Sequence, residues 1–275
     1  MVLHSEGNVD AMEYRVLARK YRPQNFKDLI GQDVLVRTLS NAFSQGRLAH
    51  AFILTGVRGV GKTTTARIIA KGINCIGADG KGGATIDPCG VCANCTGIME
   101  DRHVDVMEMD AASRTGVDDI REILDGVRYK PVAARNKVYI IDEVHMLSRN
   151  AFNALLKTLE EPPENVKFIF ATTEIRKVPV TVLSRCQRFD LKRLGMEDLA
   201  RLFSTVCQKE NVSIERDALY ALARAADGSA RDGLSLLDQS MALSVGEITA
   251  EVVQGMLGSS DRANILDLFE ETMSG

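Results

Sequence analysis

The stretch GVRGVGKT, residues Gly56 to Thr63, decides the fold. It is a complete G-x-x-x-x-G-K-[ST] pattern that follows the apolar run AFILTG (51–56) and precedes the helical TTARIIAKGI (64–73). Gly59 and Gly61 let the backbone curl so that successive N–H groups point at phosphate oxygens, and the dipole of the following helix favours an anion there. The sequence therefore predicts a phosphate-binding loop.

This loop predicts specific roles for its residues. We expect Lys62 to reach the β- and γ-phosphates of a bound nucleotide, and the Thr63 hydroxyl to ligate Mg²⁺. A chance glycine-rich turn is the alternative, and the strand–loop–helix setting argues against it. The predicted nucleotide-binding residues are Gly56, Val57, Arg58, Gly59, Val60, Gly61, Lys62, Thr63 and Thr64.

A second signal lies about eighty residues further on, where the apolar segment VYIIDE (138–143) ends in two acids. A strand that ends there would place Asp142 at the carboxyl edge of the sheet beside the loop, where it would hold Mg²⁺ through water. Glu143 is then well placed to orient or deprotonate an attacking water. An acidic strand end alone is often only a solvated turn, so the pairing with the loop carries this prediction.

The first two-thirds of the chain alternate between strand and helix patterns. Four short, nearly continuous apolar runs are typical of strands covered on both faces, namely AFILTG (51–56), DVMEMDA (105–111), KVYIIDEV (137–144) and VKFIFATT (166–173). A helix is predicted to begin after Ser148, a good N-cap, with Phe152 and Leu159 on its apolar face, and to end before Pro162. This alternation predicts a parallel α/β sheet.

After about Lys192 only helix-period patterns remain, interrupted at Gly228, Gly246 and Gly258. Ser229 followed by Asp232 resembles a capping box. We expect a small helical domain here, and the final segment has the pattern of a helix cut short, so the natural protein is expected to continue.

Bulk composition sets the class of protein. The 275 residues include 45% hydrophobic and 26% charged residues, which is typical of a globular protein, and this length favours two domains. The formal net charge of −3 argues against a generally basic surface that binds nucleic acid. The N-terminus shows no secretory signal, and no apolar run approaches the ~18 residues of a membrane helix. We therefore expect a cytoplasmic protein with reduced thiols and no membrane partner.

Four of the six cysteines form a pattern of their own: Cys75, Cys89, Cys92 and Cys95. Four thiolates at this tight spacing predict a closed, structural zinc site, and the glycine-rich loop GADGKGGA (77–84) lets Cys75 fold back onto the others. An iron–sulfur cluster is the chemical alternative. Cys186 and Cys207 lack such neighbours and are interpreted as ordinary buried or free thiols.

Further segments make a resemblance specific. They are VLARKYRPQNFKDLIGQ (16–32), DAASRTGVDDIR (110–121), IDEVHMLSRNAFNALLKTLEEPPENVKFIFATTE (141–174), PVTVLSRCQRF (179–189) and GSARDGLSLLDQ (228–239). Together with the loop and the four-cysteine insertion, they resemble the tau/gamma ATPase subunits of bacterial DNA polymerase III clamp loaders, members of the AAA+ class. The resemblance runs from about Met12 to about Leu257, and the helical collar domain of known members is absent.

The resemblance implies an architecture. We expect an N-terminal extension (1–11) and an AAA+ domain (12–193) with a parallel five-stranded sheet and a zinc-binding insertion (75–95). A helical lid (194–260) and the start of a truncated helical region (261–275) would follow.

The resemblance also assigns further catalytic roles. Thr173 occupies the position of the sensor 1 residue that contacts the γ-phosphate or the water, with Thr172 as a second choice. Arg185 in the SRC motif resembles an arginine finger that reaches the ATP of a neighbouring subunit. Arg231 resembles sensor 2, which couples ATP to lid closure. The predicted catalytic set is Lys62, Asp142, Glu143, Thr173, Arg185 and Arg231.

Other charged residues carry weaker predictions. Arg15, Arg19, Lys20 and Arg22 lie in the segment that resembles the family's adenine-side wall, although a solvated face is the more common role of such a run. Candidates for DNA contact, through shape and charge, are Arg114, Ser148, Arg149, Asn150 and Lys157. His103 and His145 are interpreted as packed or solvated imidazoles.

The function that these resemblances imply is ATP hydrolysis coupled to opening a sliding clamp and loading it onto primed DNA. The implied partners are delta, delta prime and further tau/gamma subunits, the sliding clamp, and primer–template DNA. Polymerisation would belong to the holoenzyme, since nothing in the chain resembles a polymerase palm. A non-hydrolysing scaffold subunit and a DNA-translocating AAA+ motor are the two alternatives.

Overall fold

The fold is described from a computed structural model, in which residues 16–258 are placed. Three sequence predictions lie outside these described residues: the N-terminal extension 1–11, the nucleotide role of Arg15, and the truncated helical region 261–275. No helix within residues 16–258 is both long and apolar enough to cross a membrane.

The described chain first forms an α/β part. Its elements are α1 (Leu17–Lys20), η1 (Phe26–Asp28), α2 (Asp33–Ser44), β1 (Ala51–Thr55), α3 (Lys62–Asn74), α4 (Ala93–Met99), β2 (Val106–Asp110), α5 (Val117–Val127), β3 (Lys137–Asp142), η2 (Val144–Met146), α6 (Arg149–Glu160), β4 (Val166–Thr172), η3 (Ile175–Lys177), α7 (Val180–Leu183) and β5 (Gln187–Asp190). The helical part that follows contains α8 (Met196–Glu210), α9 (Arg216–Ala225), α10 (Ala230–Leu243) and α11 (Ala250–Met256).

The five strands form one parallel sheet in the order β2-β3-β4-β1-β5, which confirms the predicted fold class. The four apolar runs of the sequence correspond to β1, β2, β3 and β4. The fifth strand, β5, lies at the edge beside β1, and only Phe189 of its residues is buried. Because β1 lies between β4 and β5, the strand order reverses there, which is where open α/β sheets bind ligands.

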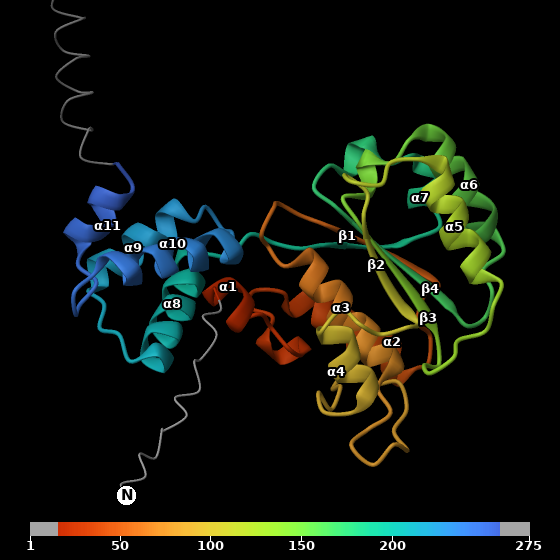
Figure 1. Ribbon diagram of the computed structural model, residues 1–275, viewed down its shortest axis with the longest axis horizontal. Helices are drawn as coiled ribbons and strands as arrows, with labels where there is room; N and C mark the ends of the chain where they lie inside the picture. The colour runs from red at the N-terminus through yellow and green to blue at the C-terminus, as the bar shows by residue number, and fades with distance from the viewer. Residues whose placement is uncertain (1–15, 259–275) are drawn as a thin grey trace, which may run out of the picture.

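Helices cover both faces of the sheet, as Figure 1 shows, with α5, α6 and α7 on one side and α2, α3 and α4 on the other. Alternate residues of each strand serve the two layers. In β3, Tyr139 and Ile141 join the core beneath α5 and α6, whereas Val138 and Ile140 pack against α2 and α3. Burial on both faces explains the nearly continuous apolar runs of β1, β3 and β4. The edge strand β2 was predicted to be covered on both faces, but only its Met109 is buried, because one of its edges has no neighbouring strand.

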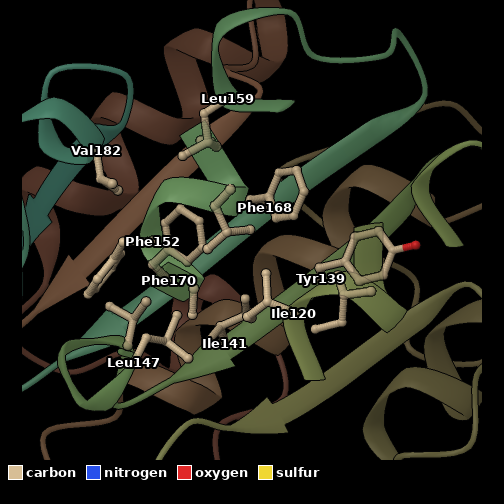
Figure 2. Packing of buried hydrophobic residues seen from close by; sticks show 14 of the residues in the cluster. Ile120, Tyr139, Ile141, Leu147, Phe152, Leu159, Phe168, Phe170 and Val182 are labelled. Atoms are coloured by element: carbon tan, nitrogen blue, oxygen red, sulfur yellow. The ribbon is translucent and has the colours of Figure 1, made fainter. Parts of the chain in front are cut away.

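The core beneath α5 and α6 is built around a row of aromatic rings (Figure 2). The ring of Phe168 in β4 stacks on Tyr139 of β3 at 5.5 Å and on Phe170 at 5.9 Å between centroids. Phe152 and Leu159 of α6 complete this core, as the sequence pattern predicted. Ser148 is the N-cap of α6 and accepts a hydrogen bond from the Ala151 N–H, which fixes where the helix begins.

The helical part forms its own core from α8, α9, α10 and α11. The short helix α1, near the start of the described chain, also contributes Leu17 to this core rather than to the α/β layers. The Leu17 backbone N–H donates to the Asp238 carboxylate of α10 at 3.4 Å, and Lys20 pairs with Glu210 of α8. The segment at the start of the described chain therefore connects the helical lid to the α/β part. The sequence pattern did not predict that α1 would pack in the lid core.

Candidate functional site

The candidate site lies at the carboxyl edge of the sheet, where β1, β3 and β4 end side by side. β1 runs into the glycine-rich loop, β3 ends in Asp142, and β4 ends just before Thr173. Parallel strands present their carboxyl ends on one side, so residues separated by more than a hundred positions meet here.

The loop turns directly into α3 through Gly61. Gly61 is the N-cap of α3 and has a φ of 104°, in the left-handed region that residues with a Cβ rarely adopt. The first turn of α3 therefore opens toward the loop, and its unpaired N–H groups are available to an anion.

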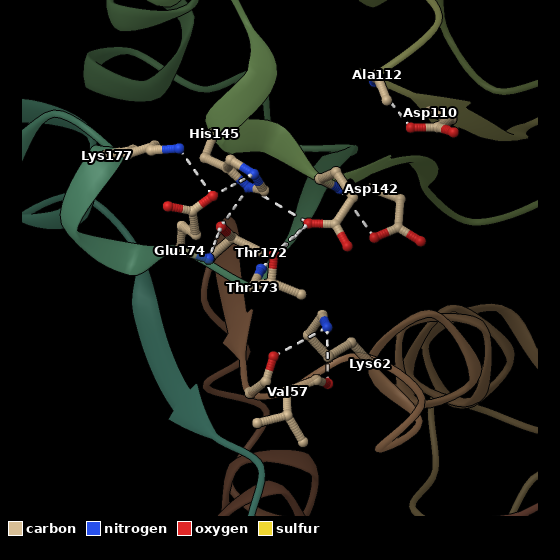
Figure 3. A network of polar contacts seen from close by, with 12 residues as sticks. Val57, Lys62, Asp110, Ala112, Asp142, His145, Thr172, Thr173, Glu174 and Lys177 are labelled. Atoms are coloured by element: carbon tan, nitrogen blue, oxygen red, sulfur yellow. Dashed lines mark hydrogen bonds and ion pairs between the residues drawn. The ribbon is translucent and has the colours of Figure 1, made fainter. Parts of the chain in front are cut away.

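Lys62, the first residue of α3, is only 6% exposed and turns back into the loop. Its ammonium donates to the carbonyl oxygens of Gly56 at 3.0 Å and Val57 at 3.1 Å, as Figure 3 shows. Burial lowers the pKa of Lys62, whereas the carboxylates of Glu143 and Asp142 oppose this shift. A cation enclosed by two carbonyls and close to two carboxylates is a suitable receptor for phosphate oxygens.

Thr63 and Asp142 meet across the site. The Thr63 hydroxyl donates to the Asp142 Oδ2 at 2.5 Å, and the other carboxylate oxygen accepts from the Glu143 N–H at 2.9 Å. A hydroxyl and a carboxylate are oxygen ligands of the type that Mg²⁺ prefers, so this donor set fits the ion. The structure thus brings together the two residues that sequence reasoning selected from segments 79 positions apart.

Glu143 adopts an unusual backbone conformation, with a φ of 46°. This left-handed geometry costs a residue with a Cβ of order 1 kcal/mol and persists only where the surroundings impose it. Its carboxylate Oε2 accepts from the Thr173 N–H at 3.2 Å and from the Thr173 hydroxyl at 2.9 Å. The predicted water-orienting acid and the predicted sensor residue are therefore in direct contact.

The lid reaches this site through the start of α10. The Arg231 N–H donates to the Gly59 carbonyl at 3.3 Å, so the first turn of α10 lies against the loop. A Cβ built on Gly59 would lie 2.0 Å from the Ser229 hydroxyl oxygen and 3.2 Å from the Arg231 Cβ. The absence of a side chain at Gly59 is thus what allows the lid to approach so closely.

Arg185 lies away from the loop, at the end of α7. Its guanidinium pairs with the Glu160 carboxylate of α6 at 2.5 Å and donates to the Thr181 carbonyl at 2.6 Å. Its hydrogen-bond partners within residues 16–258 are Thr181, Ser184 and Glu160, and none of them belongs to the loop 56–63. The structure therefore does not bring Arg185 together with the other predicted catalytic residues of the same chain, as is expected of a group that serves a neighbour.

The four predicted metal-ligating cysteines do come together, next to the end of α3. Their sulfur atoms all lie within 4.8 Å of one another, close to the about 3.8 Å that separates thiolates around a tetrahedral zinc. Burial opposes ionisation of Cys89, yet N–H groups of Val91 and Cys92 and the neighbouring thiols lower its pKa to about 7. Four thiols in this arrangement fit a closed, structural metal site.

The cysteine cluster is anchored to the phosphate-binding helix. Cys75 follows α3 as its C-cap, and Arg135, just before β3, donates to the carbonyls of Ile73, Cys75 and Gly82. Cys186 and Cys207 lie outside the cluster, and burial raises the pKa of their thiols to about 12 and about 11.

The candidate DNA residues are all exposed and lie around the start and outer face of α6; they are Arg114, Ser148, Arg149, Asn150 and Lys157. The Ser148 N–H donates to the Thr115 carbonyl, which holds the segment with Arg114 next to this helix end.

The adenine-side candidates that the structure describes divide into two kinds. Arg19 and Lys20 are exposed, with Lys20 in an ion pair with Glu210, whereas Arg22 is half-buried. Burial, together with the positive charges of Arg67 and Arg231, lowers the pKa of Arg22, whereas the Glu108 carboxylate opposes this shift.

Two features of the site escaped sequence reasoning. One is the contact of Gly59 with the lid, which depends on tertiary structure. The other is His145, whose ring lies 2.9 Å from the Thr172 hydroxyl and 3.3 Å from the Glu143 carboxylate, not in a merely space-filling position. Its only signal in the sequence is that it follows the acidic strand end.

The fold and this site define a P-loop nucleotide-binding protein of the AAA+ class. A solved structure of the Holliday junction branch migration motor RuvB of Thermotoga maritima has the same fold, with a TM-score of 0.63 and 19% identity, and the likeness covers 87% of this chain and 72% of that one. At this identity the likeness concerns the fold alone.

Sequence comparison identifies the family. Residues 31–195 match the family described as DNA polymerase III, delta subunit, and residues 199–246 match the DNA polymerase III clamp loader subunit, ATPase lid domain. The chain is 52% identical to DNA polymerase III subunit tau of Escherichia coli over 259 residues, 94% of this chain and 40% of that protein. It is 49% identical to subunit gamma of Buchnera aphidicola subsp. Schizaphis graminum over 247 residues, covering 90% of this chain and 67% of that protein.

The chain therefore belongs to the family of DNA polymerase III tau and gamma subunits, and it corresponds to their ATPase and lid portion. It spans 40% of the length of the Escherichia coli relative.

The contact between loop and lid generates a steric prediction. Substitution Gly59→Ala places a methyl group against Ser229 and should move α10 away from the loop. Rotation of the Ser229 hydroxyl would break its cap hydrogen bond with the Asp232 N–H and would leave the Cβ atoms of Ser229 and Arg231 at 3.2 Å from the methyl group. A double electron–electron resonance distance between spin labels on α6 and α10 should lengthen in this variant.

Gly61→Ala is the matched control, since Gly61 also has a positive φ but nothing lies within 4 Å of an added Cβ. It should leave the distance unchanged. Equal distances in Gly59→Ala and the wild type would show that the loop does not set the position of the lid.

Proposed function

We propose that this chain is an ATPase subunit of a DNA polymerase III clamp loader, in which binding and hydrolysis of ATP drive the opening of a sliding clamp and its loading onto primed DNA. The observation that carries the proposal is the convergence of Lys62, Thr63, Asp142 and Glu143 at one sheet edge. Relatives of about half-identical sequence are named tau and gamma subunits, which supports the same assignment.

Phosphate binding would rest on the loop and on the start of α3. The loop N–H groups and the Lys62 ammonium would hold the β- and γ-phosphates, with Lys62 exchanging its two carbonyl partners for phosphate oxygens. Thr63 and Asp142 would hold Mg²⁺, directly and through water. The ion would supply positive charge to the phosphate oxygens.

Hydrolysis would depend on the contact between Glu143 and Thr173. The Thr173 N–H and hydroxyl both bind the same carboxylate oxygen, which fixes the orientation of the acid. Glu143 would then orient and deprotonate the attacking water, while Thr173 would respond to the presence of the γ-phosphate. We assign to Glu143 the role of general base and to Thr173 that of a sensor.

The lid and a neighbouring subunit would complete the site. Arg231 lies in the first turn of α10 beside Gly59, from where its exposed side chain can extend toward a γ-phosphate. Arg185, which points away from the loop of its own chain, would enter the site of an adjacent subunit and stabilise the charge of the transferring phosphoryl group. Because only ATP offers a γ-phosphate to these groups, ATP would favour the closed, assembled state.

Assembly implies partners. We propose delta, delta prime and further tau/gamma subunits as neighbours, and the sliding clamp and primer–template DNA as the bodies on which the complex acts. Phosphate contacts with DNA are assigned to Arg114 and the start of α6, where a helix N-terminus and a positive side chain lie together.

Two other functions receive less support. A scaffold subunit without hydrolysis would not need the contact of Glu143 with Thr173 or the pairing of Thr63 with Asp142. A DNA-translocating motor is suggested only by the fold likeness to RuvB, which at 19% identity carries no function.

The catalytic assignment predicts a division between binding and turnover. In the full-length chain assembled with its clamp-loader partners, clamp and primed DNA, Lys62→Ala should abolish ATP binding. Arg185→Ala should preserve binding but lower DNA-stimulated hydrolysis by about 10³-fold, the contribution expected of an arginine finger. Nucleotide binding and steady-state phosphate release measure the two effects.

Arg188→Ala is the matched control, because Arg188 is an exposed arginine three positions further on that pairs with Asp190. It should hydrolyse ATP at the wild-type rate. Equal turnover in all three variants and the wild type would contradict the mechanism.

We further propose that the four-cysteine cluster holds a structural zinc ion. A closed set of four thiolates leaves no position for a substrate, so the ion would stabilise the fold and not take part in hydrolysis. Through Cys75 and Arg135 the cluster would brace the end of α3 against the start of β3.

Replacing one ligand should remove the ion. Cys95→Ser should lose the zinc that wild-type protein carries and should melt at a lower temperature, because bound metal stabilises the folded state. Elemental analysis and thermal denaturation test this. Cys207→Ser, an equally buried cysteine outside the cluster, should keep its zinc. Iron with visible charge-transfer absorption in the wild type would instead establish an iron–sulfur cluster.

A further inference from the structure

The buried imidazole of His145 contacts polar and charged groups of the candidate site. Its side chain is 5% exposed, yet it is enclosed by polar atoms from β4 and from the turn that follows β3. Figure 3 shows the ring above Thr172, with Glu174 and Lys177 on one side and Asp142 on the other. Any buried imidazole needs hydrogen-bond partners, and here they include the carboxylates of Glu143 and Glu174.

The two ring nitrogens face two different carboxylates. Nδ1 lies 2.9 Å from the Thr172 hydroxyl oxygen and 3.3 Å from the Glu143 Oε2. Nε2 lies 3.5 Å from the Glu174 Oε1, and that carboxylate is held in turn by Lys177 at 2.8 Å. With a proton on each ring nitrogen, the imidazole forms a bridge from Glu143 to a second acid that is itself anchored.

Three groups surround one carboxylate oxygen of Glu143, an arrangement called here the Glu143 clamp. The same oxygen, Oε2, accepts from the N–H and hydroxyl of Thr173 and faces the Nδ1 of His145. Within residues 16–258 the other oxygen, Oε1, accepts no hydrogen bond, so it is the one available to a water. Holding one oxygen from several sides orients the free oxygen of the carboxylate.

This clamp also accounts for the strained turn. Glu143 has a φ of 46°, and its carbonyl accepts from the Met146 N–H at 2.8 Å as the chain enters η2. That turn carries His145 back toward the end of β4, two residues after the acid that it contacts. Strain of this kind persists where surrounding contacts impose it, and the His145 ring is one of these contacts.

We propose that His145 is the positioning residue for the base of ATP hydrolysis: through Nδ1 it holds the Glu143 carboxylate at the end of β4, and through Nε2 it is fixed by Glu174. The inference rests on the proposed role of Glu143. It adds a residue that acts through the acid and does not itself contact the nucleotide.

Substitution of His145 by Asn or Gln distinguishes the contact of Nδ1 with Glu143 from the contact of Nε2 with Glu174. Asn places its amide nitrogen near the position of Nδ1, whereas Gln places it near Nε2. His145→Asn therefore retains a donor toward Glu143 and Thr172, and His145→Gln retains one toward Glu174. His145→Ala removes both.

The experiment measures kcat and KM for ATP in the full-length chain assembled with its clamp-loader partners, clamp and primed DNA. His145→Ala should lower kcat by about 10-fold to 100-fold, the effect of a misplaced catalytic group, while KM changes by less than about twofold. His145→Asn should recover most of the lost kcat. His145→Gln should remain as slow as His145→Ala.

Several results would overturn the inference. Recovery by His145→Gln but not by His145→Asn would assign the effect to Glu174 rather than to Glu143. Equal recovery by both, an unchanged kcat in His145→Ala, or a loss confined to KM would each show that the ring does not position the base.

A spectroscopic measurement covers the case in which the histidine variants do not fold. In protein labelled with ¹⁵N-histidine, Glu143→Gln should shift the Nδ1 resonance of His145 strongly and its Nε2 resonance weakly. An unchanged Nδ1 resonance would show that the contact with Glu143 is absent in solution.

Glu143→Gln also separates this inference from the proposed function. If Glu143→Gln retains full turnover, then Glu143 is not the base and the proposed mechanism fails. If Glu143→Gln is inactive while His145→Ala is fully active, only the positioning role of His145 fails.

Discussion

The hydrogen bond between the Thr63 hydroxyl and the Asp142 carboxylate joins the two halves of the candidate site. It connects the first turn of α3 to the end of β3, and it exists because parallel strands deliver their carboxyl ends to one edge of the sheet. Lys62 lies beside it, enclosed by the loop carbonyls, and Glu143 follows it directly in the chain. Every proposed chemical role depends on this convergence of a helix start and a strand end.

Two further layers of contact surround that junction. On one side the lid packs against Gly59 through Ser229 and Arg231, so α10 is in direct contact with the loop. On the other side Thr173 and His145 hold Glu143. Coupling of nucleotide to shape requires a contact that differs between two states, and the loop–lid contact and the clamp on Glu143 are the two places where a γ-phosphate would make that difference.

Sequence reasoning reached much of this arrangement because the relevant signals are local. The loop pattern, each apolar run of β1 to β4 and the three cysteines Cys89, Cys92 and Cys95 each occupy a short continuous stretch of sequence. β5 left no comparable signal, since its four residues, Gln187–Asp190, contain one apolar side chain, Phe189. The contact of Leu17 with the lid core, the approach of Ser229 to Gly59 and the bridge through His145 were out of reach because each joins elements distant in sequence.

The central claim is that the loop and the end of β3 form one receptor for a triphosphate and its metal ion. A crystal structure of the assembled protein with Mg²⁺ and a non-hydrolysable ATP analogue tests it most directly. The account predicts that the Lys62 ammonium leaves the carbonyls of Gly56 and Val57 for the phosphate oxygens, and that Thr63 and Asp142 separate around the ion. An analogue bound elsewhere, with the contact between Thr63 and Asp142 unchanged, would contradict it.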